Sequence, residues 1–89
     1  MVQKWKVVFT KDAEKNFLEL DKGISVRVRK KLEWLEGNFD QIVPLPLERE
    51  WIGFFKLKIG DYRVIYKIFW DEHLLMVSCV GHRSEVYEI

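Results

Sequence analysis

The sequence contains few of the residues that build disulfides and metal centres. It has one cysteine, two histidines and two prolines among 89 residues. The single cysteine, Cys79, cannot form an internal disulfide, and its place in the apolar run 74–80 indicates a small buried side chain in a reducing compartment. A zinc site needs three or four ligands, and no carboxylate cluster suggests magnesium. We therefore expect neither a metal nor another cofactor.

Several catalytic and targeting motifs are also absent. No glycine-rich phosphate loop is present, and no serine lies in a glycine-flanked turn, which argues against P-loop enzymes and serine hydrolases. The apolar runs are too short to span a bilayer, and the N-terminal residues lack the pattern of a signal peptide. We expect a cytoplasmic protein with no membrane partner.

What the chain does contain is enough apolar surface for one core. With 48% hydrophobic and 15% aromatic residues, residues 1–89 predict a single domain. The net charge is only +1, but the charges are unevenly placed. Between residues 52 and 68 a single acidic residue, Asp61, accompanies four cations: Lys56, Lys58, Arg63 and Lys67. The local field, rather than the total charge, is expected to select the partner.

The first half of the chain predicts a strand and a helical hairpin. Residues 3–10 alternate as a strand does. Thr10 can cap a first helix, which Gly23 ends, and a second helix begins near residues 24–25 and stops at Gly37. The outer helical surface carries several cations, interpreted as an ordinary solvated face rather than a nucleic-acid contact: Arg27, Arg29, Lys30 and Lys31.

The second half predicts a loop and three sequential antiparallel strands. Residues 39–52 hold both prolines and form the expected mobile loop. Two strands then meet at the Gly60–Asp61 turn, and a last strand covers about 73–80. The expected fold class is α+β: an N-terminal strand, a helical hairpin and three antiparallel strands, with helices on one sheet face and the other face partly open.

The turn at Gly60–Asp61 fixes a register for the two strands. Ile59 should face Tyr62, which brings Lys58 opposite Arg63. The core face then carries Phe55, Leu57, Ile59, Tyr62, Val64 and Tyr66, and the other face carries Lys56, Lys58, Arg63 and Lys67. Like charges facing each other across a ladder are destabilising, so this second face suggests an anionic partner.

The tail adds further polar groups near this face. If Gly81 ends the last strand, then His82, Arg83 and Tyr87 can gather there. Cations bind phosphates, lysine and histidine can transfer protons, and a tyrosine ring can stack on a base. Such a set could cleave RNA without a metal, because the 2′-hydroxyl of RNA can attack the neighbouring phosphate.

Simpler interpretations of the same residues stay open. Lys56 and Lys58 fit a solvated hairpin face, and Arg63 fits an ion pair with Asp61 or Glu85. The ring of Tyr87 could pack on the core. A lone histidine such as His82 is more often structural than catalytic.

Residues 56–66 followed by residues 80–87 resemble the RelE/ParE superfamily of toxin–antitoxin toxins, and most closely its RelE branch. The resemblance covers nearly the whole chain and implies the RelE-like microbial ribonuclease fold. It further implies a metal-independent, ribosome-dependent endoribonuclease that cleaves messenger RNA and inhibits translation. The implied partners are the ribosome, messenger RNA and a cognate antitoxin that binds the toxin in a hetero-oligomer.

The resemblance also assigns roles to residues. Lys56 and Lys58 resemble the paired lysines of the family, of which the second is the usual general-base candidate. Arg63 matches the arginine that stabilises the charged phosphate, and Arg83 the arginine that acts as an acid or a phosphate clamp.

Two tail residues complete the implied set. Tyr87 matches the tyrosine that stacks on or positions the nucleotide. His82 stands where some members have lysine, and in others a histidine near the tail tyrosine takes part in proton transfer. Whether Lys58 or His82 is the base is left open, as are two other functions of this fold: ParE-like inhibition of DNA gyrase by binding, and an inactive interaction module.

Overall fold

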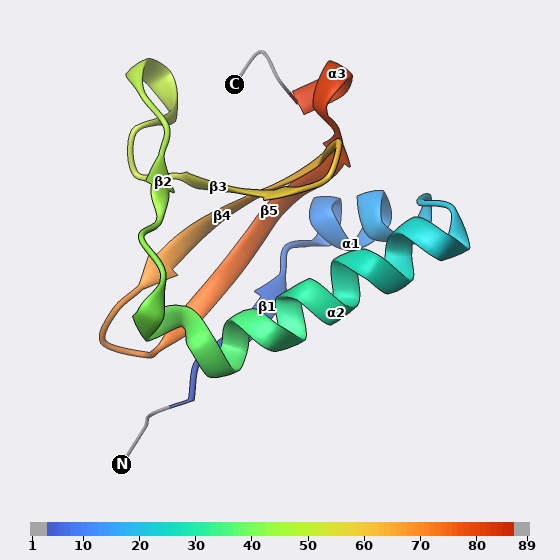
Figure 1. Ribbon diagram of the computed structural model, residues 1–89. Helices are drawn as coiled ribbons and strands as arrows, with labels where there is room; N and C mark the ends of the chain where they lie inside the picture. Colours follow the sequence, from blue (N-terminus) through green and yellow to red (C-terminus); the bar gives the residue numbers. More distant parts are fainter. Residues whose placement is uncertain (1–3, 87–89) are drawn as a thin grey trace.

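The computed structural model describes residues 4–86, which form one five-stranded sheet with helices on both of its faces (Figure 1). The strand order is β1-β5-β4-β3-β2, with β1 parallel to β5 and the other neighbours antiparallel. The strands are β1 (Lys6–Phe9), β2 (Leu45–Pro46), β3 (Phe55–Ile59), β4 (Tyr62–Phe69) and β5 (Leu74–His82). The helices are α1 (Lys11–Leu18), α2 (Lys22–Asn38) and α3 (Arg83–Val86), with 3₁₀ turns η1 (Phe39–Gln41) and η2 (Arg49–Trp51). The predicted α+β class is confirmed.

The helical hairpin begins as expected but turns earlier. The Thr10 hydroxyl accepts a hydrogen bond from the Ala13 N–H at 3.1 Å, which caps α1. The first helix ends at Leu18, so the predicted end at Gly23 is wrong. Gly23 instead lies in the first turn of α2, where the amide groups have no helical partner and glycine is tolerated. The Ser25 N–H donates to the Asp21 carbonyl at 2.8 Å, which shows where α2 starts.

The main core lies between this hairpin and the sheet. Helix α2 contributes Val28, Leu32 and Leu35, all buried. The sheet contributes Val64 and Tyr66 from β4, together with other buried side chains: Ile59, Leu75, Val77 and Val80. Burial of this apolar surface fixes which sheet face the helices cover.

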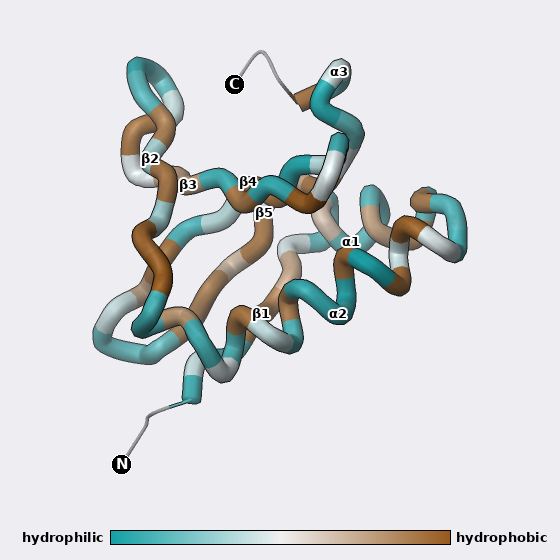
Figure 2. The backbone as a smooth tube through the Cα atoms, in the orientation of Figure 1, coloured by the Kyte–Doolittle hydropathy of each residue, from teal (hydrophilic) through white to brown (hydrophobic). Residues whose placement is uncertain are grey.

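The register between β3 and β4 is the predicted one. Ile59 pairs with Tyr62 and Lys58 pairs with Arg63, and Leu57 pairs with Val64, which is completely buried. Gly60 has φ of +60°, as the first central residue of a type II′ turn requires. The separation of the two faces follows from this register, and Figure 2 shows hydrophilic and hydrophobic residues alternating along β3.

The segment predicted as a loop is partly structured. It contains η1, β2 and η2, and β2 pairs with β3, so β3 is not the edge of the sheet. The Leu47 N–H donates to the Phe54 carbonyl at 2.9 Å, and the Leu47 side chain is buried. Pro46 therefore belongs to an edge strand, a position where proline is tolerated, and Pro44 comes just before that strand.

The face opposite α1 and α2 has different neighbours. Helix α3 and the β2–η2 segment both rise on that side of the sheet, with β3, β4 and β5 between them (Figure 1). We call this side the open face. Within the described residues, no helix has the length and apolar content needed to cross a membrane.

Candidate active site

Four cations lie on the open face, as the alternation predicted. Lys58 and Arg63 are direct cross-strand partners, and Lys56 pairs with Ile65 on the same face. Lys67 comes two residues after Ile65 on β4 and therefore lies on the same face of the sheet. Ile65 is only 1% exposed and lies outside the main core cluster, so the cations surround a small apolar centre. Cross-strand partners have Cβ atoms roughly 5 Å apart, which keeps Lys58 and Arg63 within reach of one ligand.

Arg63 is held by the β3–β4 turn. One of its Nη atoms donates to the Gly60 carbonyl at 2.9 Å and to the Tyr62 carbonyl at 3.0 Å. The predicted alternative, an ion pair with Asp61 or Glu85, is not formed among the described residues. A guanidinium group has five N–H donors, so most of them stay available for a phosphate oxygen.

The Lys58 side chain is exposed and makes no hydrogen bond or ion pair with the described part of the chain. Lys67 is different, because its Nζ lies 4.7 Å from the centre of the Phe54 ring. Phe54 in turn packs edge to face against Trp51 of η2, with ring centres 5.3 Å apart. These two aromatic residues border the open face, and the sequence pattern did not point to them.

Arg83 lies beside the same turn. The backbone N–H of Arg83 donates to the Asp61 carbonyl at 2.8 Å, and the side-chain Nε of Arg83 is 4.0 Å from a carboxylate oxygen of Asp61. The two side chains are 58% and 69% exposed. An ion pair this long and exposed is weak, so an incoming phosphate can displace Asp61.

The structure does not bring His82 to the cations. Strand β5 continues through His82, so the expected end at Gly81 is wrong. His82 pairs with Tyr62, and their rings meet edge to face at 5.3 Å, on the side opposite Lys58 and Arg63.

His82 also has a structural role. Its Nδ1 accepts the Ser84 N–H at 3.1 Å, while a Glu85 carboxylate oxygen accepts the His82 N–H at 3.4 Å. This reciprocal pattern resembles a capping box at the start of α3. Gly81 allows α3 to pack closely, since a Cβ there would lie 3.3 Å from Val86 and from Glu85.

The last predicted site residue, Tyr87, lies outside the described residues. Its role stays a prediction.

Cys79 lies on the open face as the partner of Ile65. Burial raises the pKa of its thiol, and the negative charge of Glu85 raises it further. A raised pKa disfavours the thiolate, which argues against a reactive thiol, but Cys79 is only half-buried, so the predicted buried side chain is only partly realised.

A cavity of about 630 Å³ lies on the other side of the molecule, between α1, α2 and β1. Its apolar lining includes Phe9, Phe17 and Leu32, while its charged residues are mostly acidic: Glu14, Glu33 and Glu36, with Arg29. Such a rim repels phosphates. Within residues 4–86, no three His, Cys, Asp or Glu side chains are grouped to hold a metal ion.

Comparisons with solved structures agree with this fold. The toxin–antitoxin complex RelBE2 from Mycobacterium tuberculosis is 28% identical, with a TM-score of 0.81 over 91% of this chain and 100% of the matched one. A RelE mutant from Escherichia coli in complex with a RelB antitoxin peptide is 26% identical, with a TM-score of 0.69 over 97% of this chain and 93% of that one.

The archaeal RelE–RelB complex from Pyrococcus horikoshii is 21% identical and shares the fold, with a TM-score of 0.71 over 91% of this chain and 97% of that one. No curated protein matches the sequence significantly. Residues 7–87 match the model of a family described as the ParE toxin of the type II toxin–antitoxin system parDE. With this match over nearly its whole length and RelE toxins as its structural neighbours, the chain belongs to the ParE toxin family within the RelE/ParE superfamily.

Proposed function

We propose that this type II toxin is a ribosome-dependent endoribonuclease that cleaves messenger RNA in the cytoplasm and thereby inhibits translation. The observation that carries the proposal is the Lys58–Arg63 cross-strand pair on the open face. Two adjacent cations, one held by backbone carbonyls and one free, suit the binding of a phosphate whose charge increases during reaction.

The proposed reaction uses the RNA's own nucleophile. Lys58, in its neutral form, removes the proton from the 2′-hydroxyl, and the 2′-oxygen attacks the adjacent phosphorus. Arg63 stabilises the added negative charge, and Arg83 clamps the phosphate after leaving Asp61. The bond to the 5′-oxygen breaks, and this oxygen takes a proton from water. The products are a 2′,3′-cyclic phosphate, or the 3′-phosphate that forms from it, and a free 5′-hydroxyl.

Lys58 is the proposed base because its side chain is exposed beside Arg63 and has no ion-pair partner among residues 4–86. We propose Lys58 rather than His82 because His82 lies on the other side of the sheet. Lys56 adds to the phosphate-binding field, and the resemblance proposes Tyr87 as the stacking residue.

The proposed partner that restrains the toxin is a cognate antitoxin. The most similar structures described above contain RelB-type antitoxins bound to the toxin. We expect a hetero-oligomer in which the antitoxin blocks ribosome entry. Co-purification with the protein from the neighbouring gene tests this partner.

A ParE-type activity is the second candidate, because the matching family is described as the ParE toxin. Such a protein would inhibit DNA gyrase by binding and would not need Lys58 or Arg63 as reacting groups. The open-face cations favour the ribonuclease.

Cleavage of messenger RNA on purified translating ribosomes separates the two candidates. We expect Arg63→Ala to lower the cleavage rate about ten- to a thousandfold, as loss of one transition-state donor does. Lys58→Ala should slow cleavage while ribosome binding is retained, and Lys30→Ala, an exposed cation of α2, serves as the control. If the native chain leaves messages intact and inhibits supercoiling by gyrase, the ribonuclease proposal is wrong and the ParE-type activity is supported.

A further inference from the structure

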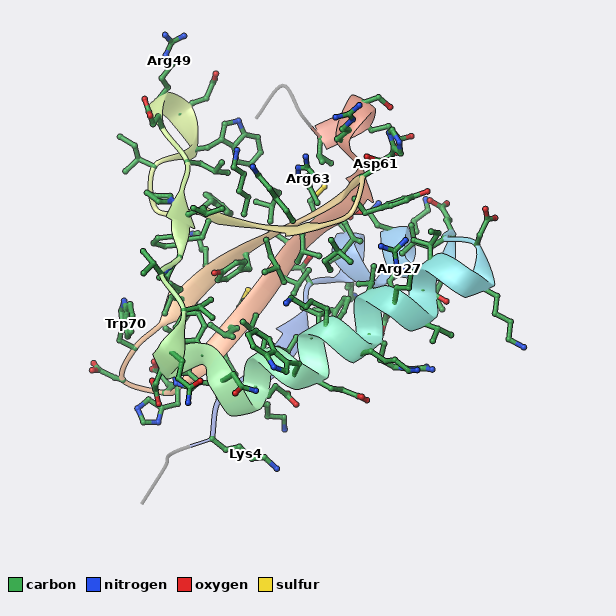
Figure 3. All side chains as sticks on the ribbon, in the orientation of Figure 1. Lys4, Arg27, Arg49, Asp61, Arg63 and Trp70 are labelled. Carbon is green, nitrogen blue, oxygen red and sulfur yellow. The ribbon has the colours of Figure 1, made fainter. Side chains whose placement is uncertain are left out.

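The β3–β4 turn is approached by an arginine from the helical side. Arg27 of α2 places Nη2 2.8 Å, Cζ 3.6 Å and Nη1 3.7 Å from the position that a Cβ of Gly60 would occupy. The guanidinium group therefore fills the space that glycine leaves free at this turn. Figure 3 shows Arg27 on the α2 side, Arg63 on the open face and Asp61 at the turn.

Two other arginines contact the same two-residue turn. Arg63 donates to the Gly60 carbonyl, and Arg83 contacts both the carbonyl and the carboxylate of Asp61. Three arginines thus approach this turn, and among residues 4–86 only Arg83 contacts the Asp61 carboxylate. The excess of positive charge at this turn is balanced by no other ion pair within residues 4–86.

We propose that Arg27 is a further phosphate-binding residue, which holds the RNA backbone next to the phosphate bound by Arg63. The inference rests on the proposed ribonuclease function. Adding ordinary backbone dimensions to the contacts at Gly60 places the nearest nitrogens of Arg27 and Arg63 within about 10 Å of each other. With this upper bound on their separation, the two guanidinium groups can contact neighbouring phosphates of one strand, since phosphates follow one another roughly every 3.4 Å along the axis of a stacked strand.

The turn connects the two sides of the sheet. RNA bound at Lys58 and Arg63 on the open face can pass over the turn, where Gly60 has no side chain of its own, and meet the Arg27 guanidinium that lies against Gly60. Arg29, two residues along the same helix, lines the acidic cavity instead. It offers a control with the same chemistry in a different place.

The test measures binding to ribosomes programmed with a message that carries 2′-O-methyl groups in the decoding-site codon, so that the message is not cleaved. Arg27→Ala should weaken binding roughly tenfold, as expected for loss of a charged hydrogen bond. It should also lower the slope of log affinity against log salt concentration by about 0.7–0.9, because one fewer counterion is released. Arg27→Lys should keep the slope because it keeps the charge, and Arg29→Ala should leave both quantities unchanged.

The outcomes are distinguishable. A salt-dependent native complex in which Arg27→Ala behaves like Arg29→Ala overturns the role of Arg27 and leaves the ribonuclease intact. A native chain that does not bind programmed ribosomes overturns both. A purely structural effect of Arg27→Ala, with a lower melting temperature and an unchanged salt slope, also overturns the inference.

Discussion

At the scale of single residues, the open face combines one cation that is held with one that is free. Arg63 is fixed by two backbone carbonyls, which lowers the entropy lost when it binds a phosphate. Lys58 makes no ion pair with the described residues, so it can meet a ligand without first losing a partner. This arrangement is what a reaction with a developing negative charge requires.

Cys79 gives a prediction about reactivity. Because burial and Glu85 raise the pKa of its thiol, the thiolate fraction at neutral pH is low, and we expect slow alkylation by iodoacetamide. Glu85→Gln removes the negative charge but keeps an acceptor for the His82 N–H, so it should speed the reaction. A pH profile of alkylation with a midpoint below that of a free thiol, about 8.5, would contradict this account.

Tyr66 gives a prediction about stability. Its hydroxyl is buried with no hydrogen-bond partner among residues 4–86, and burial raises the pKa of Tyr66 to about 12. The phenol ionises near pH 10 in the unfolded chain but only near pH 12 in the folded one. The free energy of unfolding is therefore independent of this group below about pH 10 and falls as the pH rises from about 10 to about 12. Tyr66→Phe should remove this part of the alkaline loss and raise stability at pH 7 by about 1 kcal/mol.

Urea denaturation at pH 7 and near pH 11 measures both effects. Tyr62→Phe, at a half-buried position, is the control. A Tyr66→Phe protein that is less stable at pH 7, with an unchanged alkaline loss, would show that the hydroxyl has a partner.

At the scale of elements, the β3–β4 hairpin connects the core to the site. Its inner residues pack against α2, and its outer residues carry the cations. The side chain of Arg27 lies against Gly60, so α2 and the β3–β4 hairpin are in contact at the turn where the cations gather. A change at this turn affects stability and site together.

Gly60→Ala should destabilise the fold by about 1–2 kcal/mol, because L-residues disfavour the left-handed conformation, and its Cβ would lie 2.8 Å from Arg27 Nη2. Gly37→Ala is the matched control: it lies in α2 with nothing within 4 Å of the added Cβ. It should stabilise the protein by about 0.5–1 kcal/mol. Thermal denaturation that ranks the two variants in the opposite order would refute this view of the turn.

His82 tests the role of α3. His82→Asn keeps a side-chain acceptor for the Ser84 N–H and should cleave messages at close to the native rate, whereas His82→Ala should lose about 1 kcal/mol of stability. Denaturation curves and cleavage assays of both variants provide the readout. A cleavage loss in His82→Asn as large as that in Lys58→Ala would identify His82 as the base.

Much of this arrangement could be predicted from sequence where the pattern is local. Alternation on both sides of Gly60 determines the register and separates the two faces. The end of β5 was not predictable in this way, because pairing with Tyr62 extends the strand through His82. The bulge in β5 opposite Ile65–Tyr66, where Ser78 is the extra residue, could not be predicted from the sequence pattern either. The approach of Arg27 to Gly60 depends on how α2 packs on the sheet, which no local pattern encodes.

At the scale of the whole molecule, a net charge of +1 conceals two chemically different surfaces. The open face gathers cations around β3 and β4, while the cavity beside α1 has a mostly acidic rim. The proposed RNA substrate would be attracted to the first surface and repelled by the second, which would orient the molecule on the proposed ribosomal site. The fold is shared with other toxins of the superfamily, and the open-face cations are the basis for proposing RNA cleavage by this chain.

The chemistry of the cut ends tests the central claim most directly. The native chain would be added to ribosomes programmed with a message, and both new ends would be identified. We predict a 2′,3′-cyclic phosphate or 3′-phosphate upstream and a 5′-hydroxyl downstream, with no cleavage when a single 2′-deoxy nucleotide replaces the one before the cut. A 3′-hydroxyl with a 5′-phosphate, or unchanged cleavage of the 2′-deoxy message, would contradict the account.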